Sequence, residues 1–132
     1  MFKQIHHIAF AVYDLEGVVK KLEKEYNLIR EKRVMIKDRD MEAILYKTGK
    51  TRLEFLSPIS EESPLNKYLE NNKEGFHHIA YLVDDINEAK KQLPEGSLEP
   101  IRKSSVGNWL IADLEDDYSL LNITSQLIQE NK

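Results

Sequence analysis

All four histidines of the chain occur as two adjacent pairs, His6-His7 and His77-His78. Imidazole nitrogens bind metals and move protons near neutral pH, so these pairs are candidates for a metal or proton-transfer site. A single histidine on a strand is more often packed or solvent-facing than a ligand. Two pairs that are 71 residues apart point instead to a repeated structural position.

The segments that carry the two pairs repeat each other. Residues 5–22 and 76–93 are identical at 8 of 18 aligned positions, whereas unrelated stretches would share about one. In each copy the strand-like residues around the histidines are followed by an aspartate, Asp14 or Asp85, in the position of a helix N-cap. An amphipathic helical pattern follows each aspartate. The duplication predicts that each half begins with a strand and a helix.

Further strands are expected after each helix, at residues 32–37, 41–48 and 51–56 in the first half and 98–103, 108–114 and 119–124 in the second. The sequence therefore predicts an α+β fold of two βαβββ modules. We expect one domain over residues 1–132, with repeat 1 at about 1–60 and repeat 2 at about 75–126. A connecting helix is expected at about 63–72, with Ser63 as its N-cap.

A carboxylate in the middle of a predicted strand, Glu54, adds a third candidate ligand. It lies between Leu53 and Phe55, and a buried carboxylate needs a cation or metal as a partner. Alignment of residues 51–57 with 119–125 pairs Glu54 with Asn122. The duplication thus groups four positions as candidate metal ligands: His7, Glu54, His78 and Asn122. Two imidazoles and a carboxylate suit Zn²⁺, Co²⁺, Ni²⁺, Fe²⁺ or Mn²⁺, whereas Asn122 offers only a neutral oxygen.

The composition limits the kinds of ligand and binding partner that the protein is expected to have. The chain has no cysteine, which excludes disulfides and thiolate ligands. Its 19 Lys and Arg against 23 Asp and Glu give a net charge of −4, so nucleic acid is not expected as a partner. No apolar run has membrane-spanning length, and the first residues lack a signal-peptide pattern. We expect a soluble cytoplasmic protein with a small-molecule substrate.

The two HHIA segments, together with LEFLSPISEESPLNKYLENNKEGFHHIAYLVDDI at residues 53–86, resemble the vicinal oxygen chelate (glyoxalase/bleomycin resistance/dioxygenase) superfamily. Within it, the resemblance is strongest to methylmalonyl-CoA epimerase-like proteins. It implies a curved mixed sheet around a cleft, with a divalent metal at its centre. Carried over by position, the ligands are His7, Glu54 and His78. Asn122 stands where such proteins have a glutamate.

The resemblance implies a metal-dependent epimerase or glyoxalase-type lyase that acts on a small acyl thioester, such as a CoA thioester, or on an α-oxo compound. Glu42 matches the position of a catalytic glutamate in some epimerases, although a solvent-facing strand residue is the favoured interpretation. Because Asn122 replaces the last glutamate, a non-catalytic small-molecule-binding member is the alternative. A lyase or dioxygenase with another base is a third reading. We also expect a homodimer, since a sheet of two modules leaves edges to protect.

Overall fold

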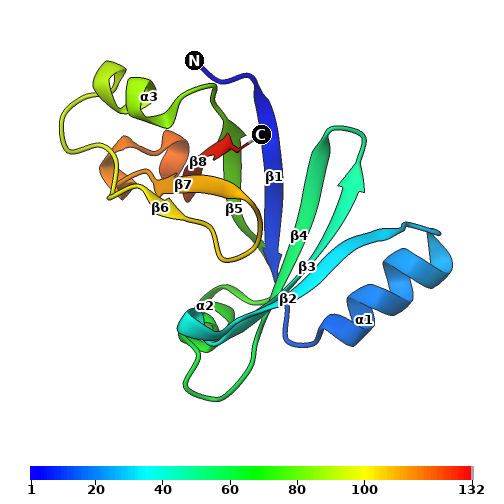
Figure 1. The fold of residues 1–132 in the computed structure, drawn as a ribbon. Coiled ribbons are helices and arrows are strands. Elements are labelled where there is room, and N and C mark those ends of the chain that lie inside the picture. Colours follow the sequence, from blue (N-terminus) through cyan, green and yellow to red (C-terminus); the bar gives the residue numbers. More distant parts are fainter. Residues whose placement is uncertain (132) are drawn as a thin grey trace. The chain divides into compact units, whose positions relative to one another are not determined.

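The computed structural model describes residues 1–131 and confirms two βαβββ modules (Figure 1). The first contains β1 (Gln4–Ala11), α1 (Leu15–Val19) continued by a π-helical segment (Lys20–Glu25), β2 (Arg30–Ile36), β3 (Met41–Thr48) and β4 (Thr51–Pro58). The helix α2 (Pro64–Asn72) follows. The second module contains β5 (Gly75–Leu82), α3 (Ile86–Gln92), β6 (Arg102–Lys103), β7 (Trp109–Asp113) and β8 (Ser125–Glu130). Within residues 1–131, no helix combines the length and apolar character that a membrane span requires.

The eight strands belong to one mixed sheet, in the hydrogen-bonded order β2-β3-β4-β1-β5-β8-β7-β6. The strands β5 and β8 pair in parallel, whereas β2-β3, β3-β4, β6-β7 and β7-β8 are antiparallel. Two compact units make up the chain: Met1–His7 together with the chain from His78 onward, and Ile8–His77. The expected α+β class is therefore confirmed.

In the unit Ile8–His77, helix α1 covers one face of the strands β3 and β4. Asp14 caps the helix, since its Oδ1 accepts the N–H of Glu16 at 2.9 Å. Leu15 of the helix packs with Ile44 and Tyr46 of β3, and all three are buried. Burial of this apolar stripe holds the helix against the strands.

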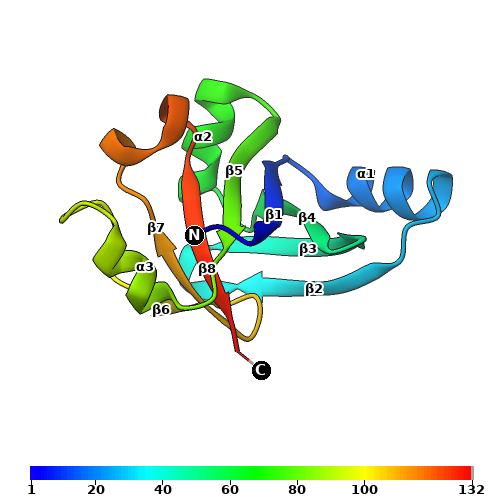
Figure 2. The ribbon, with the colours of Figure 1, turned by 90° about the horizontal axis from the view of Figure 1, so that it is seen from above.

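In the other unit, helix α3 packs against β7 and β8. Asp85 caps this helix as well, accepting the N–H groups of Asn87 and Glu88. Ile86 and Ala89 pack with Ala112 and Leu127 in a buried cluster. Figure 2 shows β8 (red) beside β5 (green), in agreement with their parallel pairing. The equivalent caps confirm that the duplication extends to local structure.

The strand expected at residues 119–124 is wrong. The chain there forms two short 3-10 turns, Asp116–Tyr118 and Leu120–Asn122, and β8 begins only at Ser125. Leu121 and Asn122 have φ angles of 54° and 60°, which an extended strand does not contain. The last strand thus lies several residues later than the hydrophobic pattern predicted.

Replacement of leucine by alanine should lower the free energy of unfolding more at a buried position than at an exposed one. Leu127→Ala removes a fully buried side chain and should lower the free energy of unfolding by about 2–5 kcal/mol. The matched change Leu120→Ala, at a side chain that is 69% exposed, should cost less than about 1 kcal/mol. Urea unfolding followed by circular dichroism measures both. Equal losses would contradict the core described above.

Candidate metal centre

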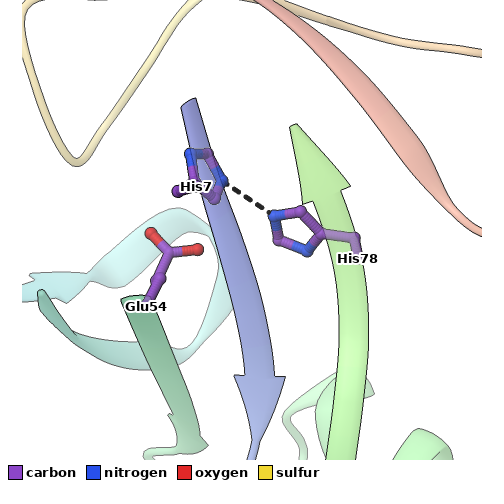
Figure 3. A group of neighbouring side chains, drawn as sticks. All are labelled: His7, Glu54 and His78. Carbon is purple, nitrogen blue, oxygen red and sulfur yellow. Dashed lines mark hydrogen bonds between the residues drawn. The ribbon is translucent and has the colours of Figure 1, made fainter. Parts of the chain in front are cut away.

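His7 and His78 present their Nε2 atoms to each other. The two nitrogens are 3.0 Å apart, and both side chains are buried. Figure 3 shows the two rings projecting toward each other from neighbouring strands, β1 and β5. Two nitrogens that bind one ion at about 2.1 Å each are separated by a similar distance. The pair therefore has the spacing of two nitrogens that share a cation.

Glu54 brings a buried carboxylate to this pair. One ligand atom from each of His7, Glu54 and His78 lies within 4.8 Å of the others, and all three residues are buried (Figure 3). Glu54 lies in the middle of β4, opposite Leu45 of β3. Burial raises the pKa of the Glu54 carboxyl from 4.5 to about 7, because the charged form is kept from water. A cation would reverse that penalty for the carboxylate.

The backbone register identifies the position in the second module that corresponds to Glu54. The N–H of Val12 donates to Leu56 O at 2.8 Å, and the N–H of Val83 donates to Ile128 O at 2.9 Å. Val12 and Val83 are equivalent in the repeat, so Leu56 is equivalent to Ile128. Glu54 precedes Leu56 by two residues, and Gln126 precedes Ile128 by two. Gln126, in place of Asn122, is therefore the counterpart of Glu54.

Gln126 has the features of a residue directed at a site. It pairs with Ala80 in β5, so its side chain shares a sheet face with His78, two residues away. The residue is only 8% exposed. Its Nε2 donates to Asp113 Oδ1 at 2.9 Å, whereas its Oε1 is buried and has no hydrogen-bond partner among residues 1–131. A buried, unpaired amide oxygen is unusual and marks a candidate ligand atom.

The structure places Asn122 elsewhere. Asn122 is exposed and lies on the 3-10 turn before β8. The earlier alignment failed because the turns between β7 and β8 lengthen the second module relative to the first. The signal that was missed is the apolar pair that follows each site residue, Leu127-Ile128 after Gln126 and Phe55-Leu56 after Glu54.

The geometry argues against the expectation that Glu42 is a base at this site. Glu54 lies opposite Leu45, three residues from Glu42 on β3, so the carboxylates of Glu42 and Glu54 leave opposite faces of the β3-β4 pair. Glu42 instead shares the helix-covered face with Tyr46 and accepts two hydrogen bonds from Arg33, at 3.0 and 3.2 Å. This bidentate ion pair gives Glu42 a structural role.

A family model described as "Glyoxalase/Bleomycin resistance protein/Dioxygenase superfamily" matches residues 6–111. The chain belongs to this superfamily. The resemblance found in the sequence is thereby confirmed, and the matched residues include His7, Glu54 and His78.

Among curated relatives of this superfamily member, an ethylmalonyl-CoA/methylmalonyl-CoA epimerase of Cereibacter sphaeroides is 33% identical over 107 residues, covering 76% of this chain and 80% of that protein. The human mitochondrial methylmalonyl-CoA epimerase is 28% identical over 99 residues, covering 74% of this chain. The match spans only 56% of the human protein's length.

Solved structures confirm the fold of this superfamily member. A selenomethionine methylmalonyl-CoA epimerase superposes with a TM-score of 0.88 at 22% identity, covering 100% of this chain and 98% of that one. The Mycobacterium tuberculosis methylmalonyl-CoA epimerase gives a TM-score of 0.86 at 17% identity, covering 99% and 90%. At these identities the likeness establishes the glyoxalase-like fold.

The raised pKa of Glu54 predicts how metal-free protein responds to pH. Because the folded state favours the protonated carboxyl, the stabilisation is complete below pH 4.5 and is lost as pH rises toward 7. Glu54→Gln should remove this loss, which amounts to about 3 kcal/mol above pH 8. Chemical unfolding in chelator at pH 5 and pH 8 measures the effect. The exposed control Glu61→Gln should keep the wild-type pH dependence, and an unchanged Glu54→Gln profile would contradict the assigned burial.

Proposed function

We propose that this chain binds a divalent metal through His7, Glu54 and His78 and catalyses epimerase-type proton exchange at the α-carbon of an acyl-CoA thioester. The observation that carries the proposal is the buried cluster of three ligand atoms within 4.8 Å of one another. Such a cluster of two imidazoles and a carboxylate suits Zn²⁺, Co²⁺, Ni²⁺, Fe²⁺ or Mn²⁺.

The donor set fits a cation in two further respects. Burial raises the pKa of the Glu54 carboxyl to about 7, so a positive charge beside it would offset the desolvation cost of the ionised form. The orphaned Oε1 of Gln126 supplies a neutral fourth oxygen on the face of His78. We propose Gln126, in place of Asn122, as the weak fourth ligand.

The reaction requires breakage of the bond between the α-carbon and its hydrogen, transfer of that proton to a base, and return of a proton to the opposite face. His7, Glu54 and His78 would hold a divalent metal in a buried place, where electrostatic stabilisation is stronger than in water. When bound there, the metal would supply positive charge that favours loss of this proton. The ion pair of Glu42 with Arg33 leaves the base to a residue other than Glu42.

The substrate class is supported by the relatives. Two superfamily relatives are named as epimerases of methylmalonyl-CoA or ethylmalonyl-CoA. Structurally similar proteins include a Streptomyces coelicolor epimerase in complex with 2-nitronate-propionyl-CoA and an epimerase in complex with methylmalonyl-CoA. Methylmalonyl-CoA is therefore the first substrate to test.

Metal binding should depend on one member of the second histidine pair. His78→Ala removes a proposed ligand and should weaken Co²⁺ binding by more than about 100-fold, beyond the usual cost of losing an outer-shell partner. The adjacent His77→Ala should bind as wild type, because the His77 ring packs 4.5 Å from the Tyr68 ring. Isothermal titration calorimetry with Co²⁺ measures both. Equal affinities would overturn the ligand assignment.

A second pair of variants separates the two candidates for the fourth ligand. Gln126→Ala should weaken Co²⁺ binding, whereas Asn122→Gly should leave it unchanged, since glycine accepts the φ of 60° at that position. The same titration applies. A loss with Asn122→Gly alone would restore the original alignment.

Proton exchange tests the activity itself. Co²⁺-loaded protein should incorporate deuterium at the α-carbon of methylmalonyl-CoA in heavy water, and Glu54→Gln should reduce the rate by at least about 100-fold. Glu42→Gln should retain exchange. Mass spectrometry of the CoA ester follows the reaction. Binding of the ester without exchange would favour the non-catalytic alternative, and abolition of exchange by Glu42→Gln would reinstate Glu42 as the base.

A further inference from the structure

A continuous line of polar contacts leads from the surface to the histidine pair. Glu130 Oε1, on a side chain that is 45% exposed, lies 3.0 Å from His6 Nε2. His6 Nδ1 lies 2.8 Å from His7 Nδ1, and His7 Nε2 lies 3.0 Å from His78 Nε2. His6 is only 1% exposed. Adjacent residues of a strand point to opposite faces, yet the Nδ1 atoms of His6 and His7 meet because Nδ1 is bonded to the ring carbon nearest the backbone.

The donor and acceptor capacities of these groups allow one arrangement of protons along this line of contacts. An ionised carboxylate only accepts, so the contact with Glu130 places the proton of neutral His6 on Nε2. The Nδ1 of His6 then carries a lone pair and accepts from the Nδ1–H of His7. His7 in turn is left with a lone pair on Nε2, the atom that faces His78. A metal ligand requires such a lone pair.

The ring of His6 is held in this orientation by Trp109. The two ring centroids are 4.8 Å apart at an interplanar angle of 67°, and Trp109 is buried. The indole fits only because residue 107 is glycine, since a Cβ there would lie 1.9 Å from a Trp109 ring carbon. Packing against Trp109 thus opposes a 180° flip of the His6 ring, which would put carbon atoms in the places of both nitrogens.

We propose that Glu130 and His6 are positioning residues that fix the His7 imidazole in the Nδ1–H tautomer and so direct its Nε2 lone pair into the metal site. The inference rests on the proposed metal-binding function for its purpose, but the tautomer itself is a property of the metal-free protein. In the other half of the repeat, the ring of the equivalent residue, His77, packs against the ring of Tyr68, with centroids 4.5 Å apart.

Nitrogen-15 NMR of metal-free protein tests the tautomers directly, because protonated and bare imidazole nitrogens have well-separated chemical shifts. At a pH where the histidines are neutral, wild type should show the proton on Nε2 of His6 and on Nδ1 of His7. Glu130→Ala and His6→Phe should shift His7 toward a mixture of tautomers. Glu130→Gln should preserve the wild-type spectrum, since its amide oxygen also accepts from His6. A wild-type spectrum with His7 protonated on Nε2, or one unchanged in both disruptive variants, would overturn the proposal.

Metal titration supplies the second readout. His6→Phe and Glu130→Ala should weaken Co²⁺ binding by about 10- to 100-fold, the usual effect of losing an outer-shell partner. The controls are His77→Phe at the repeat-equivalent position and Glu95→Ala at an exposed turn, and both should bind as wild type. Glu130→Ala changes a partly exposed side chain, so the test survives if His6→Phe does not fold. If the wild type fails to bind Co²⁺, the proposed function is refuted. If the wild type binds Co²⁺ and both His6→Phe and Glu130→Ala bind it equally tightly, the positioning role is refuted.

Discussion

Two buried imidazole nitrogens 3.0 Å apart need a proton or a cation between them, because lone pairs in a low-dielectric interior repel and neither can turn to water. This constraint accounts for the arrangement of the residues around the pair. It explains why strands from the two ends of a duplicated sequence carry histidines at the same position, and why a carboxylate is buried beside them. The fold brings together groups that would be costly to bury singly, and a cation bound between them would offset that cost.

Much of the fold could be predicted because its signals are local. The repeated strand and helix, the N-caps at Asp14 and Asp85 and the helix after Ser63 each depend on residues within one turn or one strand. His7 and His78 could be predicted for the same reason, since a single offset between the two copies of the repeat relates their positions. Within the modules, apolar periodicity sufficed to place β3, β4 and β7 to within a few residues.

The features that escaped prediction depend on register between strands. Gln126 could not be identified while the turns before β8 were taken for a strand, because each inserted residue moves the alignment onto a different side chain. Whether Glu42 meets Glu54 depends on an odd or even separation across the β3-β4 pairing. That parity is set by hydrogen bonds between strands and is invisible in composition. The contact of His6 with Glu130 joins residues 124 positions apart, which no local pattern encodes.

The hydrogen-bonded trio of Arg102, Asp113 and Gln126 has a consequence for how this sequence can evolve. Asp113 accepts from Gln126 Nε2 through one oxygen and from Arg102 Nη1 through the other, each at 2.9 Å. A change of the amide to an acid would set two carboxylates against each other, and a prior change of Asp113 to an amide would deprive Arg102 of its anion. Each single step toward a second acidic residue therefore crosses a less stable intermediate. The effect of a change at residue 126 thus depends on Asp113 and Arg102, an epistatic constraint that favours the amide over an acid. Gln126 and its counterpart Glu54 therefore remain chemically different, although they occupy equivalent backbone positions in the two halves of the duplication.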